Sequence, residues 1–291
     1  MIARPRRTAL YMPASNPRAL EKVRSLDCDI VVLDLEDAVL PEMKDAAREA
    51  AAAAVRAEGF GRREVVVRVN ALETPWGEAD LAAVAAAGPD VVLVPKIRTP
   101  SDVVAYERAL SSAPQATRLW IMIETPEAIL DLAAISACGG RLGGLVMGIN
   151  DLAKETGARQ TPDRAPFHMA LSLSVTAARA HGLVALDGVH NEIDDLALLE
   201  AMCRQAADFG FDGKTLIHPS HLPICNRAFT PTLQEIEWAR CVIAAFADPE
   251  NAGKGALRVQ GRLAERLHCS QAARLVAIAE AIEASATEGQ R

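Results

Sequence analysis

The sequence predicts an α/β barrel, that is, a closed ring of eight parallel strands with the connecting helices outside it. Short β-branched runs alternate with longer alanine-rich amphipathic segments along most of the 291 residues, which is typical of repeated βα units. Half of the residues are hydrophobic and only 4% are aromatic, so we expect a core built mainly from Ala, Val, Leu and Ile. The length also allows two small domains, but the number of strand candidates favours one barrel.

Eight short apolar runs are the strand candidates. They cover residues 8–13, 30–36, 65–70, 91–97, 119–124, 144–148, 183–188 and 213–218. Most are followed by a segment with helical periodicity, so each strand is expected to reach the next through a helical crossover.

The segments between the strands carry apolar residues at helical spacing. The helix candidates cover residues 17–26, 41–57, 77–87, 101–110, 126–137, 165–181 and 193–209. Several have Pro in the first turn, as in N-P-R-A from Asn16 and T-P-E-A from Thr125. Pro is well suited to that position because the N–H that it lacks has no partner inside the helix.

Beyond the last strand, two further helix candidates, 232–246 and 271–284, flank a turn-rich link at residues 248–255. We expect residues 1–246 to form the barrel domain. Residues 247–291 are expected to form a C-terminal helical lid, which packs on the barrel mouth or on a neighbouring subunit.

Charge and cysteine usage exclude several classes of protein. The formal net charge is −7 with no basic block, which argues against binding to nucleic acid. The six cysteines are scattered without a C-x-x-C pair, as in a reduced cytoplasmic protein. No apolar stretch of signal-peptide length follows the basic N-terminus, and no run approaches the roughly 20 residues of a membrane span, so neither export nor membrane insertion is expected.

The strand ends are unusually polar, and in such a barrel the active site lies at the carboxyl ends of the strands. Glu124 and Asp151 each follow an apolar run and are expected to face the same cavity. Two facing carboxylates suit a hard divalent cation such as Mg²⁺. From the residues alone, a helix cap for one carboxylate and a lysine partner for the other explain the pair equally well.

Two basic residues near strand ends raise further alternatives. Arg68 lies in an otherwise apolar strand, and its partner is either Glu36 or Asp37 in a structural ion pair, which the sequence favours, or a substrate carboxylate. Lys96 suggests Schiff-base chemistry with a keto substrate, but the acid-rich mouth would keep it protonated. A salt bridge or a packing role is therefore favoured for Lys96.

The strand-end motifs together resemble those of the citrate lyase β-subunit family, the HpcH/HpaI group that includes the citryl-CoA, malyl-CoA and citramalyl-CoA lyases. The similarity runs from about residue 6 to residue 246. The motifs that carry it are R-R-T-A-L-Y-M-P, L-D-L-E-D-A-V, R-V-N, P-K-I, I-E-T, G-I-N-D-L-A and G-F-D-G-K-T-L-I-H-P.

The resemblance implies a (β/α)8 barrel, usually a homotrimer or a dimer of trimers. It implies that Mg²⁺, or alternatively Mn²⁺, is held by Glu124 and Asp151, with Glu124 also at the substrate. By the same resemblance, Arg68 contacts the carboxylate of the acyl group, and Arg18 and Lys22 lie near the phosphates of CoA.

The implied reaction is the reversible carbon-carbon cleavage of a 3-hydroxyacyl-CoA into acetyl-CoA and a 2-keto acid. The enolate of acetyl-CoA must then receive a proton, and in relatives an Asp of the lid, in a G-x-M-I-D pattern, often supplies it. Here the matching stretch is G-R-L-A-E-R, which places Glu265 at the position of that acid. A solvated glutamate at a helix start is the other interpretation of Glu265.

Two rival functions remain. One is a thioesterase that hydrolyses a malyl-CoA-type substrate in the same pocket. The other is a citrate lyase subunit that needs partner chains, or a CoA-binding relative that has lost turnover. In each case the D-L-E-D acids are expected to support the metal site without binding the metal directly. Glu36 and Asp37 would hold metal-bound water and orient Arg68 or the nearby Lys44 and Arg48.

Overall fold

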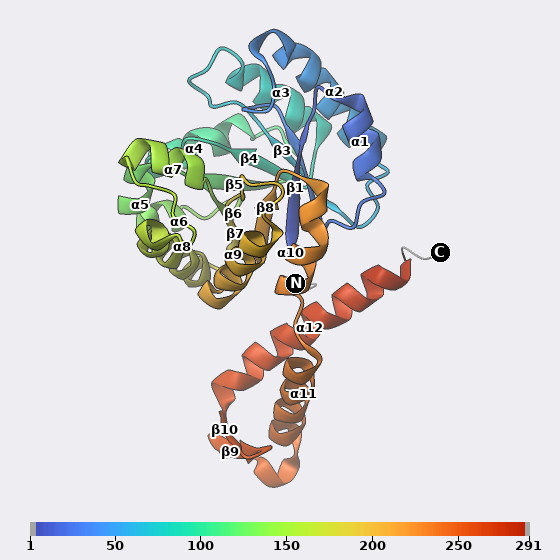
Figure 1. The fold of residues 1–291 in the computed structure, drawn as a ribbon, viewed down its shortest axis with the longest axis vertical. Coiled ribbons are helices and arrows are strands. Elements are labelled where there is room, and N and C mark those ends of the chain that lie inside the picture. Colours follow the sequence, from blue (N-terminus) through green and yellow to red (C-terminus); the bar gives the residue numbers. More distant parts are fainter. Residues whose placement is uncertain (1–3, 289–291) are drawn as a thin grey trace. The chain divides into compact units, whose positions relative to one another are not determined.

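The computed structural model describes residues 4–288 and confirms the closed eight-stranded barrel (Figure 1). The strands pair in sequence order, all in parallel, and β8 closes the ring onto β1. They are β1 (Thr8–Pro13), β2 (Ile30–Asp34), β3 (Glu64–Arg68), β4 (Val91–Val94), β5 (Arg118–Ile123), β6 (Leu142–Met147), β7 (Val184–Asp187) and β8 (Gly213–Leu216). All eight expected strands are present.

The helices surround the ring (Figure 1). They are α1 (Pro17–Val23), α2 (Lys44–Ala57), α3 (Gly77–Ala87), α4 (Pro100–Ala109), α5 (Pro126–Leu130), α6 (Leu132–Ser136), α7 (Ile149–Thr156), α8 (His168–His181), α9 (Leu196–Phe209) and α10 (Leu222–Phe229). The helix expected at 126–137 is divided at Asp131, whose backbone leaves the helical region. Helices α7 and α10 were not expected, because each is only eight residues long and directly follows a strand-end motif.

The barrel interior is filled by side chains that alternate along the strands, as the period of two requires. This inner cluster consists of Ala9, Ile30, Val32, Val66, Val91, Leu93, Trp120, Met122, Val146 and Leu186. Trp120 is the bulkiest member, and a Cβ at Gly144 on the next strand would meet its indole ring at 2.9 Å. The absence of a side chain at Gly144 therefore lets the indole fill the barrel.

The contacts divide the chain into a barrel unit, Arg6–Phe229, and a C-terminal unit that begins at Thr230. Helices α11 (Leu233–Ala247) and α12 (Arg266–Glu288) share an apolar core that includes Val242 and Ala272. Helix α11 thus belongs to the C-terminal unit, whereas the sequence placed it with the barrel domain that ended at residue 246.

A hairpin that was not expected from the sequence joins α11 to α12. Strands β9 (Ala256–Val259) and β10 (Arg262–Glu265) pair antiparallel around Gln260 and Gly261, both of which have positive φ. Two successive positive φ values define the tight turn that suits a two-residue hairpin, and Gly adopts them without strain. The hairpin lies directly after the turn-rich link at 248–255, in a stretch to which the sequence assigned no strand.

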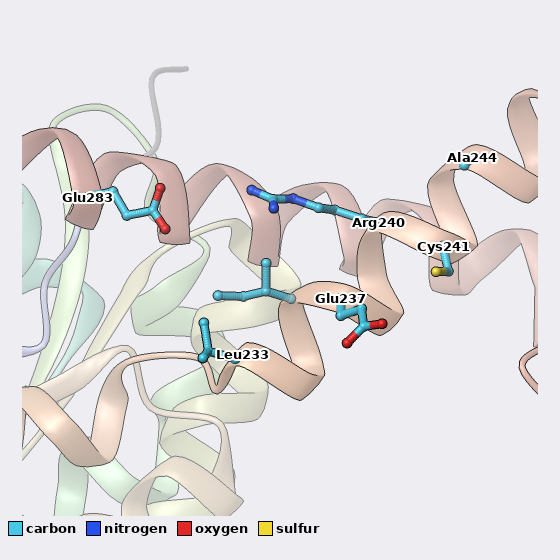
Figure 2. A pocket seen from close by; sticks show the side chains of 7 residues that line it. Leu233, Glu237, Arg240, Cys241, Ala244 and Glu283 are labelled. Atoms are coloured by element: carbon cyan, nitrogen blue, oxygen red, sulfur yellow. The ribbon is translucent and has the colours of Figure 1, made fainter.

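The C-terminal unit also contains a mainly apolar hollow of about 400 Å³ between α11 and α12 (Figure 2). Leu233, Ile236, Glu237, Arg240, Cys241, Ala244 and Glu283 line it. Figure 2 shows the Arg240 side chain extending from α11 toward the stretch of α12 that carries Glu283. Within residues 4–288, no helix is both long and apolar enough to cross a membrane.

Candidate active site

The ladder register brings Asp34 and Arg68 together at the mouth of the barrel. Each is the last residue of its strand, and the two are paired in register between β2 and β3. Asp34 continues the inward series of Val32, and Arg68 continues that of Val66, so both side chains point into the mouth. The Nε and Nη2 atoms of Arg68 donate to the two oxygens of Asp34 at 2.6 and 2.7 Å, which is a bidentate ion pair.

The remaining edge of the Arg68 guanidinium faces two more acids. Its Nη1 lies 2.7 Å from Glu36 Oε2 and 3.4 Å from Asp37 Oδ2, and its Cζ stands 4.7 Å from the centre of the Tyr11 ring. Arg68 is therefore in a structural ion pair, as expected, but its principal partner is Asp34, while the two acids named from the sequence, Glu36 and Asp37, lie at the remaining edge of the guanidinium. These contacts offset the repulsion among the D-L-E-D acids.

Lys44 stabilises the backbone of this acidic loop. Its buried Nζ donates to the carbonyl oxygens of Leu35 and Glu36 at 2.8 and 2.7 Å and to Asn70 Oδ1 at 2.7 Å. Arg48 pairs instead with Asp80 at 2.7 Å. Lys44 thus holds the main chain of the loop, and Arg48 pairs with Asp80 rather than with Glu36 or Asp37. The side chains of Glu36 and Asp37 were expected to orient both residues.

Glu36 is a strongly perturbed acid. Burial raises the pKa of Glu36 to about 8, although the charge of Arg68 acts in the opposite direction. Its Oε2 has no hydrogen bond despite the short distance to Arg68, because the guanidinium N–H is not aligned with it. A pKa raised by desolvation is typical of functional sites, so the surroundings of Glu36 at the barrel mouth are a candidate site.

We expect Glu36→Gln to become more stable relative to the unsubstituted protein as pH rises from 5 to 8.5 in EDTA. Between the ordinary pKa of 4.5 and the raised value of about 8, the unfolded chain ionises Glu36 while the folded protein does not. The contribution of Glu36 to stability is therefore complete below pH 4.5 and is lost as the pH rises toward about 8. Urea unfolding at both pH values measures the change. Glu42→Gln, an exposed site on the same loop, is the control, and an equal pH response of both variants would contradict the assignment.

A second cluster, at the ends of β4, β5 and β6, contains Glu124, Asp151 and Lys96. Glu124 directly follows β5, and Asp151 lies in the first turn of α7 after β6. The Nζ of Lys96 is 3.2 Å from Glu124 Oε1 and 2.8 Å from Asp151 Oδ1, and the backbone N–H of Lys96 also donates to Glu124 Oε1 at 2.8 Å. The structure thus brings together the two carboxylates that the sequence singled out.

The donor set of this cluster fits a hard divalent cation. Glu124 Oε2 is buried without a hydrogen-bond partner, and burial raises the pKa of Glu124 against the opposing charge of Lys96. A buried carboxylate oxygen without a partner is costly unless a cation approaches it. Residues 4–288 hold no group of three or more His, Cys, Asp and Glu side chains arranged for a metal, but Mg²⁺ commonly uses one or two carboxylates and completes its shell with water or substrate.

Three other predicted site residues lie on other elements of the chain. Arg18 and Lys22 are exposed on α1, the helix after β1, whose N-terminus is capped by the side chain of Asn16. Glu265 lies in the C-terminal unit at the end of β10, where its backbone N–H donates to His268 Nδ1 at 2.8 Å. The proposed roles of these three residues remain predictions.

The sequence reasoning missed a buried charge cluster at the ends of β7 and β8. Asp187 accepts from Lys214 Nζ at 2.7 Å and from Arg164 Nη1 at 2.8 and 2.7 Å, and none of the three side chains is more than 4% exposed. Burial alone would raise the pKa of Asp187, but the two cations outweigh it and lower the pKa. The strand-end motifs L-D-G and G-K-T were the available signal, but Arg164 comes from a loop distant in sequence.

Known proteins resemble the chain along nearly its whole length. A (3S)-malyl-CoA thioesterase from Cereibacter sphaeroides is 46% identical over 282 residues, which cover 97% of each chain. An L-malyl-CoA/beta-methylmalyl-CoA lyase from the same species is 30% identical over 308 residues, again covering 97% of each chain. The full-length match to both implies that the barrel and the C-terminal unit occur together in these relatives.

A solved structure extends this similarity to three dimensions. The protein CitE from Mycobacterium tuberculosis, in complex with magnesium, acetoacetate and coenzyme A, superposes with a TM-score of 0.76 and is 29% identical, covering 96% of this chain and 100% of that chain. The family model described as HpcH/HpaI aldolase/citrate lyase matches residues 7–219, which span almost the entire barrel unit. The chain therefore belongs to the HpcH/HpaI aldolase/citrate lyase family.

Proposed function

We propose that the protein is a Mg²⁺-dependent thioesterase that hydrolyses a malyl-CoA-type thioester to free CoA and the hydroxy acid. The observation that carries this proposal is the 46% identity to a (3S)-malyl-CoA thioesterase over 97% of both chains. It favours hydrolysis over the carbon-carbon cleavage that the motifs alone suggested. The two reactions share a substrate class and differ in which bond breaks.

Within this proposal, Glu124 and Asp151 hold the cation, which supplies Lewis acidity at the oxygen atoms of the acyl group. The acidic loop around Glu36 is held in shape by Lys44 and by the ion pair between Arg68 and Asp34. The Nη1 edge of Arg68, which Asp34 does not hold and which faces Glu36 and Asp37, is the part of the guanidinium that would contact an anionic acyl group. Arg18 and Lys22 on α1 would contact the phosphates of CoA.

The second candidate is carbon-carbon lyase activity on the same thioester. The 30% identity to an L-malyl-CoA/beta-methylmalyl-CoA lyase supports it, as does the likeness to CitE, whose structure contains magnesium, acetoacetate and coenzyme A. Only the lyase reaction needs a proton for a carbon atom, the enolate carbon of acetyl-CoA. Glu265 is the candidate for that acid. The homotrimer and the cytoplasmic location remain predictions.

Incubation of the purified protein with (3S)-malyl-CoA and Mg²⁺, followed by mass spectrometry, is expected to yield free CoA and malate. In water enriched with ¹⁸O, hydrolysis should place one heavy oxygen in the malate carboxyl group, because water adds at the thioester carbon. Chelation by EDTA is expected to lower the rate about 100-fold or more, since a Lewis acid contributes several kcal/mol.

Acetyl-CoA with a 2-keto acid as the main product would replace the thioesterase proposal with the lyase. Glu265→Gln provides a further comparison, since it should slow carbon-carbon cleavage while leaving thioester hydrolysis close to its original rate. Absence of turnover with malyl-CoA, citramalyl-CoA and citryl-CoA would contradict both activities and favour a subunit that needs partner chains.

A further inference from the structure

Lys96 lies between the two carboxylates of the candidate metal site. Its ammonium is 2.8 Å from Asp151 Oδ1 and 3.2 Å from Glu124 Oε1, so one lysine neutralises charge on both acids. Its own backbone N–H makes a third contact, to Glu124 Oε1 at 2.8 Å. Together these contacts involve one oxygen of each carboxylate and leave Glu124 Oε2 buried without a hydrogen bond.

The backbone at Lys96 is held in an uncommon conformation. Its φ is +57°, in the left-handed region that residues other than Gly rarely adopt. Such a conformation persists only where its surroundings impose it, and it is concentrated at functional sites. In this conformation the backbone N–H and the ammonium of Lys96 both approach Glu124 Oε1.

Lys96 and Arg68 differ in how easily they can leave their partners. Arg68 is held bidentately by Asp34, and its side chain is 9% exposed. The Lys96 side chain is 33% exposed, and its ammonium makes one contact with each carboxylate rather than a bidentate pair. The ammonium is compact and stands on a flexible stem. Lys96 is therefore able to turn away from the two carboxylates toward solvent without disrupting the core, whereas Arg68 is not.

We propose that Lys96 is an internal cation that occupies the Glu124 and Asp151 pair in the metal-free protein and is displaced when a divalent cation binds. This inference rests on the metal site of the proposed function. Two carboxylates, one of them fully buried, are costly without a positive charge nearby, and Lys96 supplies it before the metal arrives. The same occupancy lowers the affinity for the metal, since the ammonium must first leave.

Isothermal titration of the full-length, substrate-free protein with Mg²⁺ and with Mn²⁺ tests this inference. Lys96→Met is expected to bind each ion at least tenfold more tightly than the unsubstituted protein. Lys154→Met is the matched control, since it removes the same charge from an exposed position on α7, the helix that carries Asp151, and its affinity should stay within twofold. Lys96→Gln, which is also uncharged, carries the same expectation and replaces the Met variant if that variant does not fold.

Thermal unfolding gives an independent readout. Lys96→Met should melt at a lower temperature than the unsubstituted protein in EDTA, and saturating Mg²⁺ should remove most of the difference. If the unsubstituted protein binds the metal and both Lys96 variants bind it equally or more weakly, displacement of Lys96 is ruled out. The proposed function is unaffected by that result. Absence of Mg²⁺ binding by the unsubstituted protein would contradict the metal dependence of the proposed function and the displacement with it.

Discussion

Glu124→Gln is expected to lower metal-dependent turnover at least about 100-fold while the barrel remains folded. Glu124 is one of only two carboxylates at the candidate metal site, and Gln keeps its size and shape but removes the negative charge. The Oε2 atom of Glu124 is buried without a hydrogen bond, so a bound cation would stabilise it. Steady-state kinetics over a range of Mg²⁺ concentrations, with circular dichroism to verify folding, measures the effect.

The matched control for this variant is Glu127→Gln. Glu127 lies three residues further along the chain, on α5, and its half-exposed side chain pairs with Arg98 outside the acid cluster. Its substitution should leave turnover and metal dependence nearly unchanged. If Glu124→Gln retained full activity at low Mg²⁺, Glu124 would not be a metal ligand and the proposed site would have to be abandoned.

Asp187→Asn is expected to destabilise the protein by about 3–5 kcal/mol, the largest stability effect that we anticipate for a single charge. The substitution leaves Lys214, whose side chain is 0% exposed, and Arg164, which is 4% exposed, without their shared anion. Two buried cations would then face each other with only partial hydrogen bonding. Urea unfolding followed by tryptophan fluorescence gives the change in the free energy of unfolding.

An exposed ion pair provides the comparison for this prediction. Glu200 pairs with Arg204 one helical turn away on α9, at 2.6 Å, where solvent screens both charges. Glu200→Gln should therefore alter the unfolding curve very little. A loss of stability in Asp187→Asn no larger than that in Glu200→Gln would mean that Lys214 and Arg164 find other partners when Asp187 is changed.

The candidate site could be anticipated only in part. Glu124 and Asp151 were recognisable because each follows an apolar strand, and a strand end in a barrel has a known location. The sequence named Glu36 or Asp37 as the partner of Arg68 and did not identify Asp34, since the pairing with Asp34 depends on the register between β2 and β3. Register is set by packing across the sheet, which local sequence does not display.

The C-terminal segment shows the same limit. Its two helices were visible from their periodicity, but the hairpin between them has strands of only four residues, too short for a clear alternating pattern. The sequence placed helix α11 with the barrel, whose expected boundary coincided with the end of the family resemblance at residue 246. Its membership of the C-terminal unit depends on a shared apolar core with α12. Such a core brings together side chains far apart in the sequence, such as Val242 and Ala272.

The sequence by itself determined the barrel, the order of its strands and the acids at its mouth, because alternating βα periodicity and polar strand ends are local properties of the chain. Only the tertiary structure decided how those charges are neutralised: Asp34 with Arg68, Asp187 with Lys214 and Arg164, and Lys96 between Glu124 and Asp151. The physical reason is that buried charges are paired by strand register and by the approach of distant loops, neither of which a local pattern specifies.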